Sequence, residues 1–108
     1  MARKGYKAEL KCKKELEELY GKDNVIKVAI GGAEDFLIAG CGELIKVVEV
    51  KEIHNKKKYY PTKREKEQLN RILMFAKQHG IPAELWLYQF WGKGKPVIKT
   101  MIEVYEVK

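Results

Sequence analysis

The sequence is poor in cysteine and arginine, and it has no long apolar segment. Its two cysteines, Cys12 and Cys41, are too few for a disulfide-dense scaffold, so we expect a reduced, cytoplasmic setting. No apolar run approaches the ~18 residues that a membrane-spanning helix needs, and we expect no secretory signal in the charged N-terminal segment. Three arginines leave little capacity for bidentate recognition of bases. These shortages argue against secreted disulfide-rich proteins, membrane proteins and readers of DNA sequence.

Positive charge is what the sequence has in excess. Its 108 residues include 22 Lys and Arg against 15 Asp and Glu, a formal net charge of +7 at pH 7. Residues 1–14 hold six basic residues and one acidic residue, and residues 46–66 hold eight and three. Such clusters attract phosphate backbones without reading base sequence, although a run such as Lys56-Lys57-Lys58 is also common on solvated loops. Nucleic acid is therefore the first partner to consider.

The hydrophobic pattern predicts one α/β domain over residues 1–108, a length that suits a single core. Apolar residues at spacings of three and four predict two helices, at residues 5–20 and 62–79. Thr62 and Glu65 have the spacing of a capping box at the start of the second helix. Apolar and β-branched runs predict five strands, at residues 24–30, 35–39, 44–51, 83–91 and 97–107. This order predicts a meander followed by a helical crossover, which gives a mixed sheet of about five strands flanked by helices.

The second and third predicted strands carry a group of charged residues that suits phosphodiester hydrolysis. Asp35 begins one strand, and a tight turn at Gly40-Cys41-Gly42 brings Glu49 and Lys51 of the next strand towards it. Residues 49 and 51 share a strand face. Carboxylates are hard ligands for Mg²⁺ or Mn²⁺, and a neighbouring lysine stabilises developing negative charge. The alternative is an ordinary edge strand with opposite charges two residues apart.

Glu9 lies beside the apolar stripe of the first predicted helix, where it can lean over the sheet towards Asp35. Its alternative role is a surface ion pair with Lys13, four residues along the helix. His54, His79 and the two cysteines lack partners at metal-ligand spacing, and we assign them no chemistry. Tyr59 and Tyr60 adjoin the lysine run, where they either stack on exposed bases or pack in the core.

The segment Asp35…Glu49-Val50-Lys51 resembles the PD-(D/E)xK nuclease motif. The wider chain resembles the archaeal-type Holliday junction resolvases, a family that some viruses also carry. The resemblance covers nearly the whole chain, and its segments are Arg3-Lys4-Gly5 with Ala8-Glu9, Asp35 to Gly40, Val48 to Lys51, Lys63-Arg64-Glu65 and Gly80-Ile81-Pro82. The family usually has a serine in the loop before the aspartate, whereas residues 30–34 here have none and add Glu34.

The resemblance implies a restriction-endonuclease-like fold, a bound Mg²⁺ (or Mn²⁺) and a role for each matching residue. Asp35 and Glu49 would bind the metal with the backbone carbonyl of Val50, and Glu9 would complete the acidic group, directly or through water. Lys51 would act on the attacking water or the transition state. DNA would be contacted by basic residues that include a flexible arm at residues 1–5. This set consists of Arg3, Lys4, Lys27, Lys56, Lys57, Lys58, Lys63 and Arg64.

We therefore expect a homodimeric, metal-dependent endonuclease that acts in DNA recombination and repair. Paired nicks by two symmetry-related active sites would resolve a four-way junction, recognised by its shape. Two alternatives stay open: another nuclease of the same fold that nicks flaps or duplex DNA, and a non-catalytic nucleic-acid-binding module.

Overall fold

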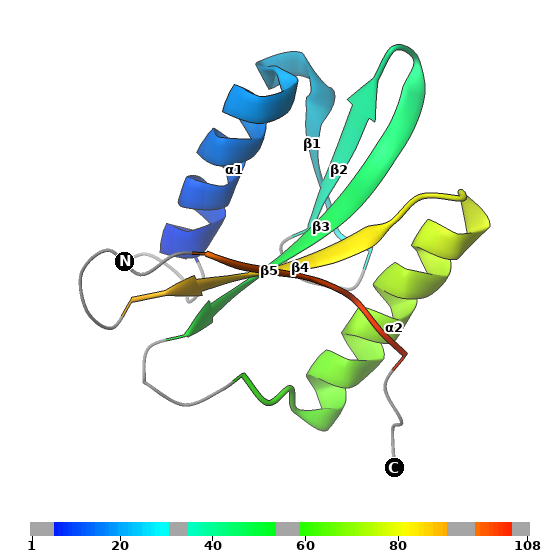
Figure 1. The fold of residues 1–108 in the computed structure, drawn as a ribbon. Helices are drawn as coiled ribbons and strands as arrows, with labels where there is room; N and C mark the ends of the chain where they lie inside the picture. Colours follow the sequence, from blue (N-terminus) through cyan, green and yellow to red (C-terminus); the bar gives the residue numbers. More distant parts are fainter. Residues whose placement is uncertain (1–5, 31–34, 54–58, 91–96, 105–108) are drawn as a thin grey trace.

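The first half of the chain forms a helix and a three-stranded meander, and the second half adds a helix and two strands (Figure 1). The computed structural model describes residues 6–30, 35–53, 59–90 and 97–104, and of Tyr6 and Asp35 it describes the backbone only. The helices are α1 (Tyr6–Tyr20), the short 3₁₀ helix η1 (Lys22–Asn24) and α2 (Lys63–Gln78). The strands are β1 (Val25–Val28), β2 (Asp35–Gly40), β3 (Glu43–Ile53), β4 (Ala83–Gln89) and β5 (Ile98–Met101).

The five strands form one mixed sheet in the order β1-β2-β3-β4-β5. Strands β1, β2 and β3 are antiparallel neighbours, β3 and β4 are parallel, and β5 returns antiparallel to β4. Parallel neighbours need a crossover, which α2 supplies between β3 and β4. The predicted architecture, a single α/β domain with a mixed five-stranded sheet between helices, is confirmed.

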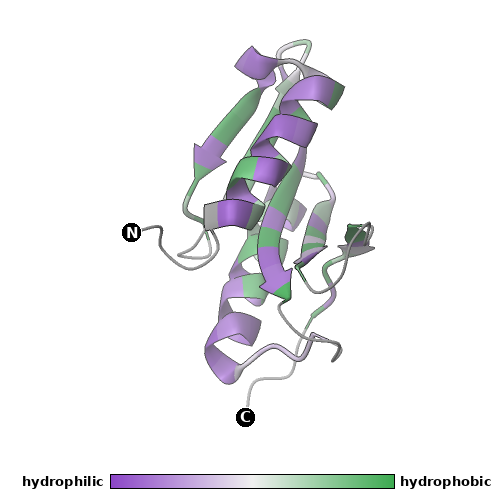
Figure 2. Ribbon diagram, turned by 90° about the vertical axis from the view of Figure 1, so that its left-hand side faces the viewer, coloured by the Kyte–Doolittle hydropathy of each residue, from purple (hydrophilic) through white to green (hydrophobic). Residues whose placement is uncertain are grey.

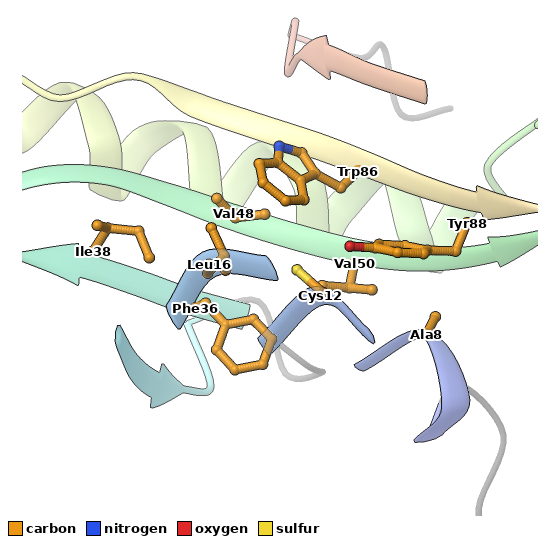
Figure 3. Close-up of a cluster of buried hydrophobic side chains, with 9 residues drawn as sticks. All are labelled: Ala8, Cys12, Leu16, Phe36, Ile38, Val48, Val50, Trp86 and Tyr88. Atoms are coloured by element: carbon orange, nitrogen blue, oxygen red, sulfur yellow. The ribbon is translucent and has the colours of Figure 1, made fainter. Parts of the chain in front are cut away.

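The sheet buries a different set of side chains on each face. The α1-side cluster consists of Ala8, Cys12, Leu16, Phe36, Ile38, Val48, Val50, Trp86 and Tyr88 (Figure 3). The α2-side cluster consists of Val47, Ile53, Leu69, Ile72, Ala76, Ala83, Leu85, Leu87 and Ile102. Successive strand residues point to opposite faces, so even-numbered residues of β3 face α1 and Val47 and Ile53 face α2. This alternation decides on which side each charged residue of β3 lies.

The predicted turns and helix ends are confirmed where the structure describes them. The side-chain oxygen of Thr62 accepts a hydrogen bond from the Glu65 backbone, and the Glu65 carboxylate accepts one from the Thr62 N–H, at 3.2 and 3.0 Å. The β2–β3 hairpin turns through Cys41 and Gly42, with φ of 52° and 79°. Two consecutive positive φ values give the twist that a two-residue hairpin needs, so the turn joins the two strands that carry Asp35 and Glu49.

Several predicted boundaries were wrong. Strand β1 ends at Val28 rather than at residue 30, because its partner β2 begins at Asp35, opposite Val28. Strand β3 continues to Ile53 rather than ending at residue 51, because β4 pairs with it as far as Gln89. Strand β4 ends at that pair, one residue before the last described residue of this segment, and within the described part of the predicted range 97–107, residues 97–104, β5 covers Ile98–Met101. Among the described residues, no helix is long and apolar enough to cross a membrane.

Candidate functional site

The hairpin brings the backbone of Asp35 directly opposite Glu49. In the β2–β3 register Asp35 pairs with Glu49, and on its other side Asp35 pairs with Val28 of β1. Beyond this row β3 continues for four residues, 50–53, paired with β4. Asp35 and Glu49 therefore lie in a row that spans all five strands, and among the described residues the next two rows join only β3, β4 and β5. The side chain of Asp35 lies outside the described part of the chain.

Glu49 carries the most deeply buried carboxylate in the described part of the chain, with 1% of its surface exposed. It lies between Asp35 of β2 and Leu85 of β4 in the register. The Nζ atom of Lys51 lies 3.8 Å from Oε1 of Glu49, and the Lys51 side chain is 16% exposed. Burying a charge is costly unless an opposite charge or a ligand compensates it. The structure thus joins Glu49 and Lys51, two of the predicted catalytic residues, on the α2 side of the sheet.

A second carboxylate, Glu65 of α2, holds Lys51 from the other side. Its Oε2 atom lies 3.6 Å from the Lys51 Nζ and accepts a hydrogen bond of 3.0 Å from the hydroxyl of Tyr59. Burial alone would raise the pKa of Glu65, but hydrogen bonds from Thr62 and Tyr59 and the charge of Lys51 together lower it. Glu65 was predicted only as a capping residue, and its contact with Lys51 was missed. The sequence carried no signal for it, because the contact depends on how the crossover helix packs.

Glu9 lies on the other face of the sheet. It is buried, with 6% of its surface exposed, and forms an ion pair with Lys27 of β1. Lys27 pairs with Phe36 in the register, which places it on the α1 face. The structure therefore joins Glu9 to Lys27, both predicted site residues, on the side of the sheet opposite to Lys51. The predicted alternative partner of Glu9 was Lys13, and the ion pair found here is with Lys27.

Glu52 of β3 is a further carboxylate at this end of the sheet. Its Oε1 atom accepts a hydrogen bond of 3.0 Å from the backbone N–H of Ala8, in the first turns of α1. A carboxylate is favourable near a helix N-terminus, where backbone N–H groups lack partners within the helix. The predicted strand ended at residue 51, just before Glu52, so this contact was missed. It fixes the start of α1, and with it Glu9, against the end of β3.

The predicted DNA-binding residues are described only in part. Lys63 and Arg64 are exposed in the first turn of α2, and Lys27 is 50% exposed beside Glu9. Tyr60 is also exposed, whereas the Tyr59 hydroxyl is taken by Glu65. The remaining predicted DNA-binding residues lie outside the described part of the chain; they are Arg3, Lys4, Lys56, Lys57 and Lys58. His54 also lies outside it.

The donor chemistry around Glu49 suits a hard divalent cation. A buried carboxylate beside the backbone of an aspartate offers the oxygen ligands that Mg²⁺ and Mn²⁺ prefer. Among the described side chains, no group of three or more His, Cys, Asp or Glu could hold a metal ion. That set does not include the side chain of Asp35. Of the predicted ligands Asp35, Glu49 and Val50, the structure thus describes the carboxylate of Glu49, and a metal bound by all three stays a prediction.

Comparison of the chain with protein-family models, with curated proteins and with solved structures finds no match.

Proposed function

We propose that this protein is a metal-dependent, structure-selective DNA endonuclease of restriction-endonuclease-like architecture, which resolves four-way junctions by paired nicks. The observation that carries the proposal is the register of Asp35 opposite Glu49, with Lys51 on the same strand and face as Glu49. The resemblance of Asp35…Glu49-Val50-Lys51 to a nuclease motif supports it, and so does the net charge of +7. Backbone-directed lysines favour recognition by shape over recognition by sequence.

In this mechanism each residue has a separate task. Glu49 and Asp35, with the Val50 carbonyl, would hold Mg²⁺ or Mn²⁺, and the ion would supply Lewis-acid activation for phosphodiester hydrolysis. Lys51, 3.8 Å from the Glu49 carboxylate, orients the attacking water or stabilises negative charge on the phosphate. Glu65 of α2 holds the Lys51 ammonium from the other side, so that the ammonium lies between two carboxylates.

Cleavage assays with defined DNA substrates test the proposal. Purified protein with Mg²⁺ or Mn²⁺ is expected to nick four-way junctions faster than flaps or linear duplex. Glu49→Gln and Asp35→Asn should each lower the rate about 100-fold or more, while junction binding stays the same or tightens because a charge that repels phosphate is gone. Glu43→Gln is the matched control, since Glu43 is an exposed glutamate on the same strand.

Three results would overturn parts of the proposal. A wild-type protein that never nicks a junction would exclude the enzyme and favour a nucleic-acid-binding module. Equal cleavage of linear duplex would exclude junction selectivity and favour a nicking or repair nuclease. A Glu49→Gln variant that cleaves as fast as Glu43→Gln would exclude the site.

The role of Glu9 needs its own variant, because Glu9 lies on the α1 face. If Glu9 belongs to the metal site, Glu9→Gln should lower cleavage as strongly as Glu49→Gln. If it serves only its ion pair with Lys27, Glu9→Gln and Lys27→Met should have equal, small effects on cleavage.

A homodimer and a cytoplasmic location belong to the same proposal. A two-fold dimer presents two active sites to two symmetry-related strands, which paired nicking requires. Light scattering coupled to size-exclusion chromatography should give twice the chain mass of 12.6 kDa, and a monomer that resolves junctions would contradict the paired arrangement.

A further inference from the structure

Two lysines of α1 share one aromatic ring at the end of β4. The Nζ atoms of Lys7 and Lys11 lie 5.2 and 5.0 Å from the centroid of the Phe90 ring. The two lysines are four residues apart on the helix, so their side chains are neighbours on its surface. Both residues are exposed, whereas Phe90 is half-buried against the α1-side cluster. A single ring therefore holds two ammonium groups at one place on the surface.

This pair is fixed to the end of the strand that carries the candidate site. The backbone N–H of Phe90 donates a hydrogen bond of 2.9 Å to the carbonyl of Ile53, the last residue of β3. Ile53 follows Lys51 by two residues. On the helix side, the Ala8 N–H bonded to Glu52 anchors the turn that contains Lys7. The position of the pair relative to β3 is thus set by a backbone hydrogen bond on the Phe90 side and by the bond from the Ala8 N–H to the Glu52 carboxylate on the helix side.

The local charges leave this place strongly positive. Like charges four residues apart on a helix repel each other, and attraction to the ring face offsets part of that cost. The acidic residue between them in the sequence, Glu9, is buried and ion-paired with Lys27. Glu52, on the same face, accepts the backbone N–H of Ala8. A concentrated, exposed double charge of this kind is stabilised when an anion binds between the two ammonium groups. Figure 2 shows that α1 is largely hydrophilic on the side turned to solvent.

We infer that Lys7 and Lys11, held over Phe90, form a two-point binding site for the DNA phosphate backbone beside the end of β3. This inference rests on the proposed function for the identity of the ligand. The phosphodiester chemistry proposed for Glu49 and Lys51, two to four residues before Ile53 on the same strand, is the reason to expect nucleic acid here rather than an anionic membrane surface. The site would hold the DNA backbone on the α1 side of the end of β3, across the sheet from Glu49 and Lys51, without reading bases.

The dependence of DNA affinity on salt tests the inference. Binding of a fluorescent four-way junction is measured by anisotropy between 0.05 and 0.5 M salt with EDTA present, so that no cleavage occurs. Each phosphate contact contributes about 0.9 to the slope of log affinity against log salt. Lys7→Ala/Lys11→Ala should lower the magnitude of the slope by about 1.8. Over a tenfold change in salt concentration, the affinity of the wild type would then change about 60-fold more than the affinity of the variant.

Two further variants separate this site from the general charge of the protein. Lys13→Ala/Lys22→Ala removes the same charge from exposed positions on another side of α1 and just beyond its end, and the slope should change by less than about 0.5. Lys7→Arg/Lys11→Arg keeps both charges and should restore the slope. Thermal unfolding of each variant checks that the helix still folds.

The outcomes distinguish this site from the proposed enzyme. An unchanged slope in Lys7→Ala/Lys11→Ala, or an equal loss in the control double variant, overturns the site even if the wild type cleaves junctions. If Lys7→Ala/Lys11→Ala shows the expected loss of slope but the wild type never cleaves DNA, the phosphate-binding site is supported and the proposed enzyme is excluded. A wild type that binds no DNA, but needs Lys7 and Lys11 to bind phosphatidylserine vesicles, overturns the site in favour of a membrane surface.

Discussion

The contact between Lys51 and Glu65 offers the sharpest test of the candidate site. Lys51 has carboxylates on two sides, with Nζ 3.8 Å from Glu49 Oε1 and 3.6 Å from Glu65 Oε2. At 3.6 Å two unit charges attract by about 4.6 kcal/mol with an effective dielectric constant of 20, and by about 1.2 kcal/mol in bulk water. Both side chains keep some exposure, 16% for Lys51 and 26% for Glu65. Desolvation and the ordering of two long side chains reduce the net coupling to about 1 kcal/mol.

A double-mutant cycle measures this coupling without any assumption about activity. Urea unfolding at pH 7 in EDTA compares the wild type, Glu65→Gln, Lys51→Met and the double variant. Gln keeps an oxygen that accepts the Thr62 N–H, so the capping box survives and the change removes mainly the charge. We expect a coupling free energy of about 1 kcal/mol between Lys51 and Glu65. Glu67→Gln, two residues along α2, serves as the control, and its effect should add to that of Lys51→Met within about 0.5 kcal/mol.

The pH dependence of the same cycle has a defined sign. Folding lowers the pKa of Glu65, so its contribution to stability is present above the ordinary pKa of a glutamate. That contribution is lost as the pH falls through the lowered value of the folded state. The coupling should therefore be full at pH 7 and vanish in acid. A coupling below about 0.3 kcal/mol at pH 7 would refute the argument that Glu65 positions Lys51. If the wild type nicks junctions, Glu65→Gln should lower kcat while KM is unchanged.

Three further predictions test the fold. Burial raises the pKa of the Cys12 thiol to about 12, while Cys41 is exposed. A thiol reagent at pH 8 should therefore react with one cysteine in the native protein and with two in urea. Two fast-reacting thiols in the native protein would contradict the packing of α1. Burial alone would lower the pKa of Lys46, but hydrogen bonds to Tyr20 and Glu84 raise it. The stability that Lys46 contributes is therefore full below its ordinary pKa of 10.5, and it is lost as the pH rises through the raised value of the folded state. The difference in unfolding free energy between the wild type and Lys46→Met should therefore shrink in strong alkali, and a constant difference would exclude the ion pair as its source. Thr62→Ala should cost about 1 kcal/mol of unfolding free energy and Thr62→Ser should recover most of it; equal stability of the two variants would show that the capping box contributes nothing.

The parts of the fold that the sequence predicted well have local causes. The capping box at Thr62 and Glu65 and the positive-φ turn at Cys41 and Gly42 each depend on a few adjacent residues. The end of β3 has a non-local cause. Glu52 and Ile53 begin a polar segment that looks like a loop, yet they stay extended because β4 pairs with them. Propensity within the segment cannot reveal a partner strand whose paired residues, Tyr88 and Gln89, lie 36 residues further along the chain.

The candidate site shows the same division. The pairing of Asp35 with Glu49 followed from a short hairpin, and the side shared by Glu49 and Lys51 followed from strand alternation. The position of Glu9 did not follow in the same way. A helical wheel shows that Glu9 borders the buried stripe of α1, but it does not show which face of the sheet α1 covers. That depends on which side chains each sheet face buries, which only the three-dimensional packing decides.

The alternation along β3 sets the path that a bound nucleic acid must take. Glu49 and Lys51 face α2, whereas Glu52 meets the start of α1, and Lys7 and Lys11 lie on the α1 side over Phe90. A ligand that lies flat on one face can meet only one of these groups. A ligand that meets both must pass around the end of β3, and in the sequence this end leads directly to Lys56-Lys57-Lys58. Under the proposed function, a junction with one arm on each face would meet both groups, whereas a straight duplex on one face would meet one. The proposal therefore predicts that Lys7→Ala/Lys11→Ala lowers the affinity for a four-way junction more than the affinity for a linear duplex.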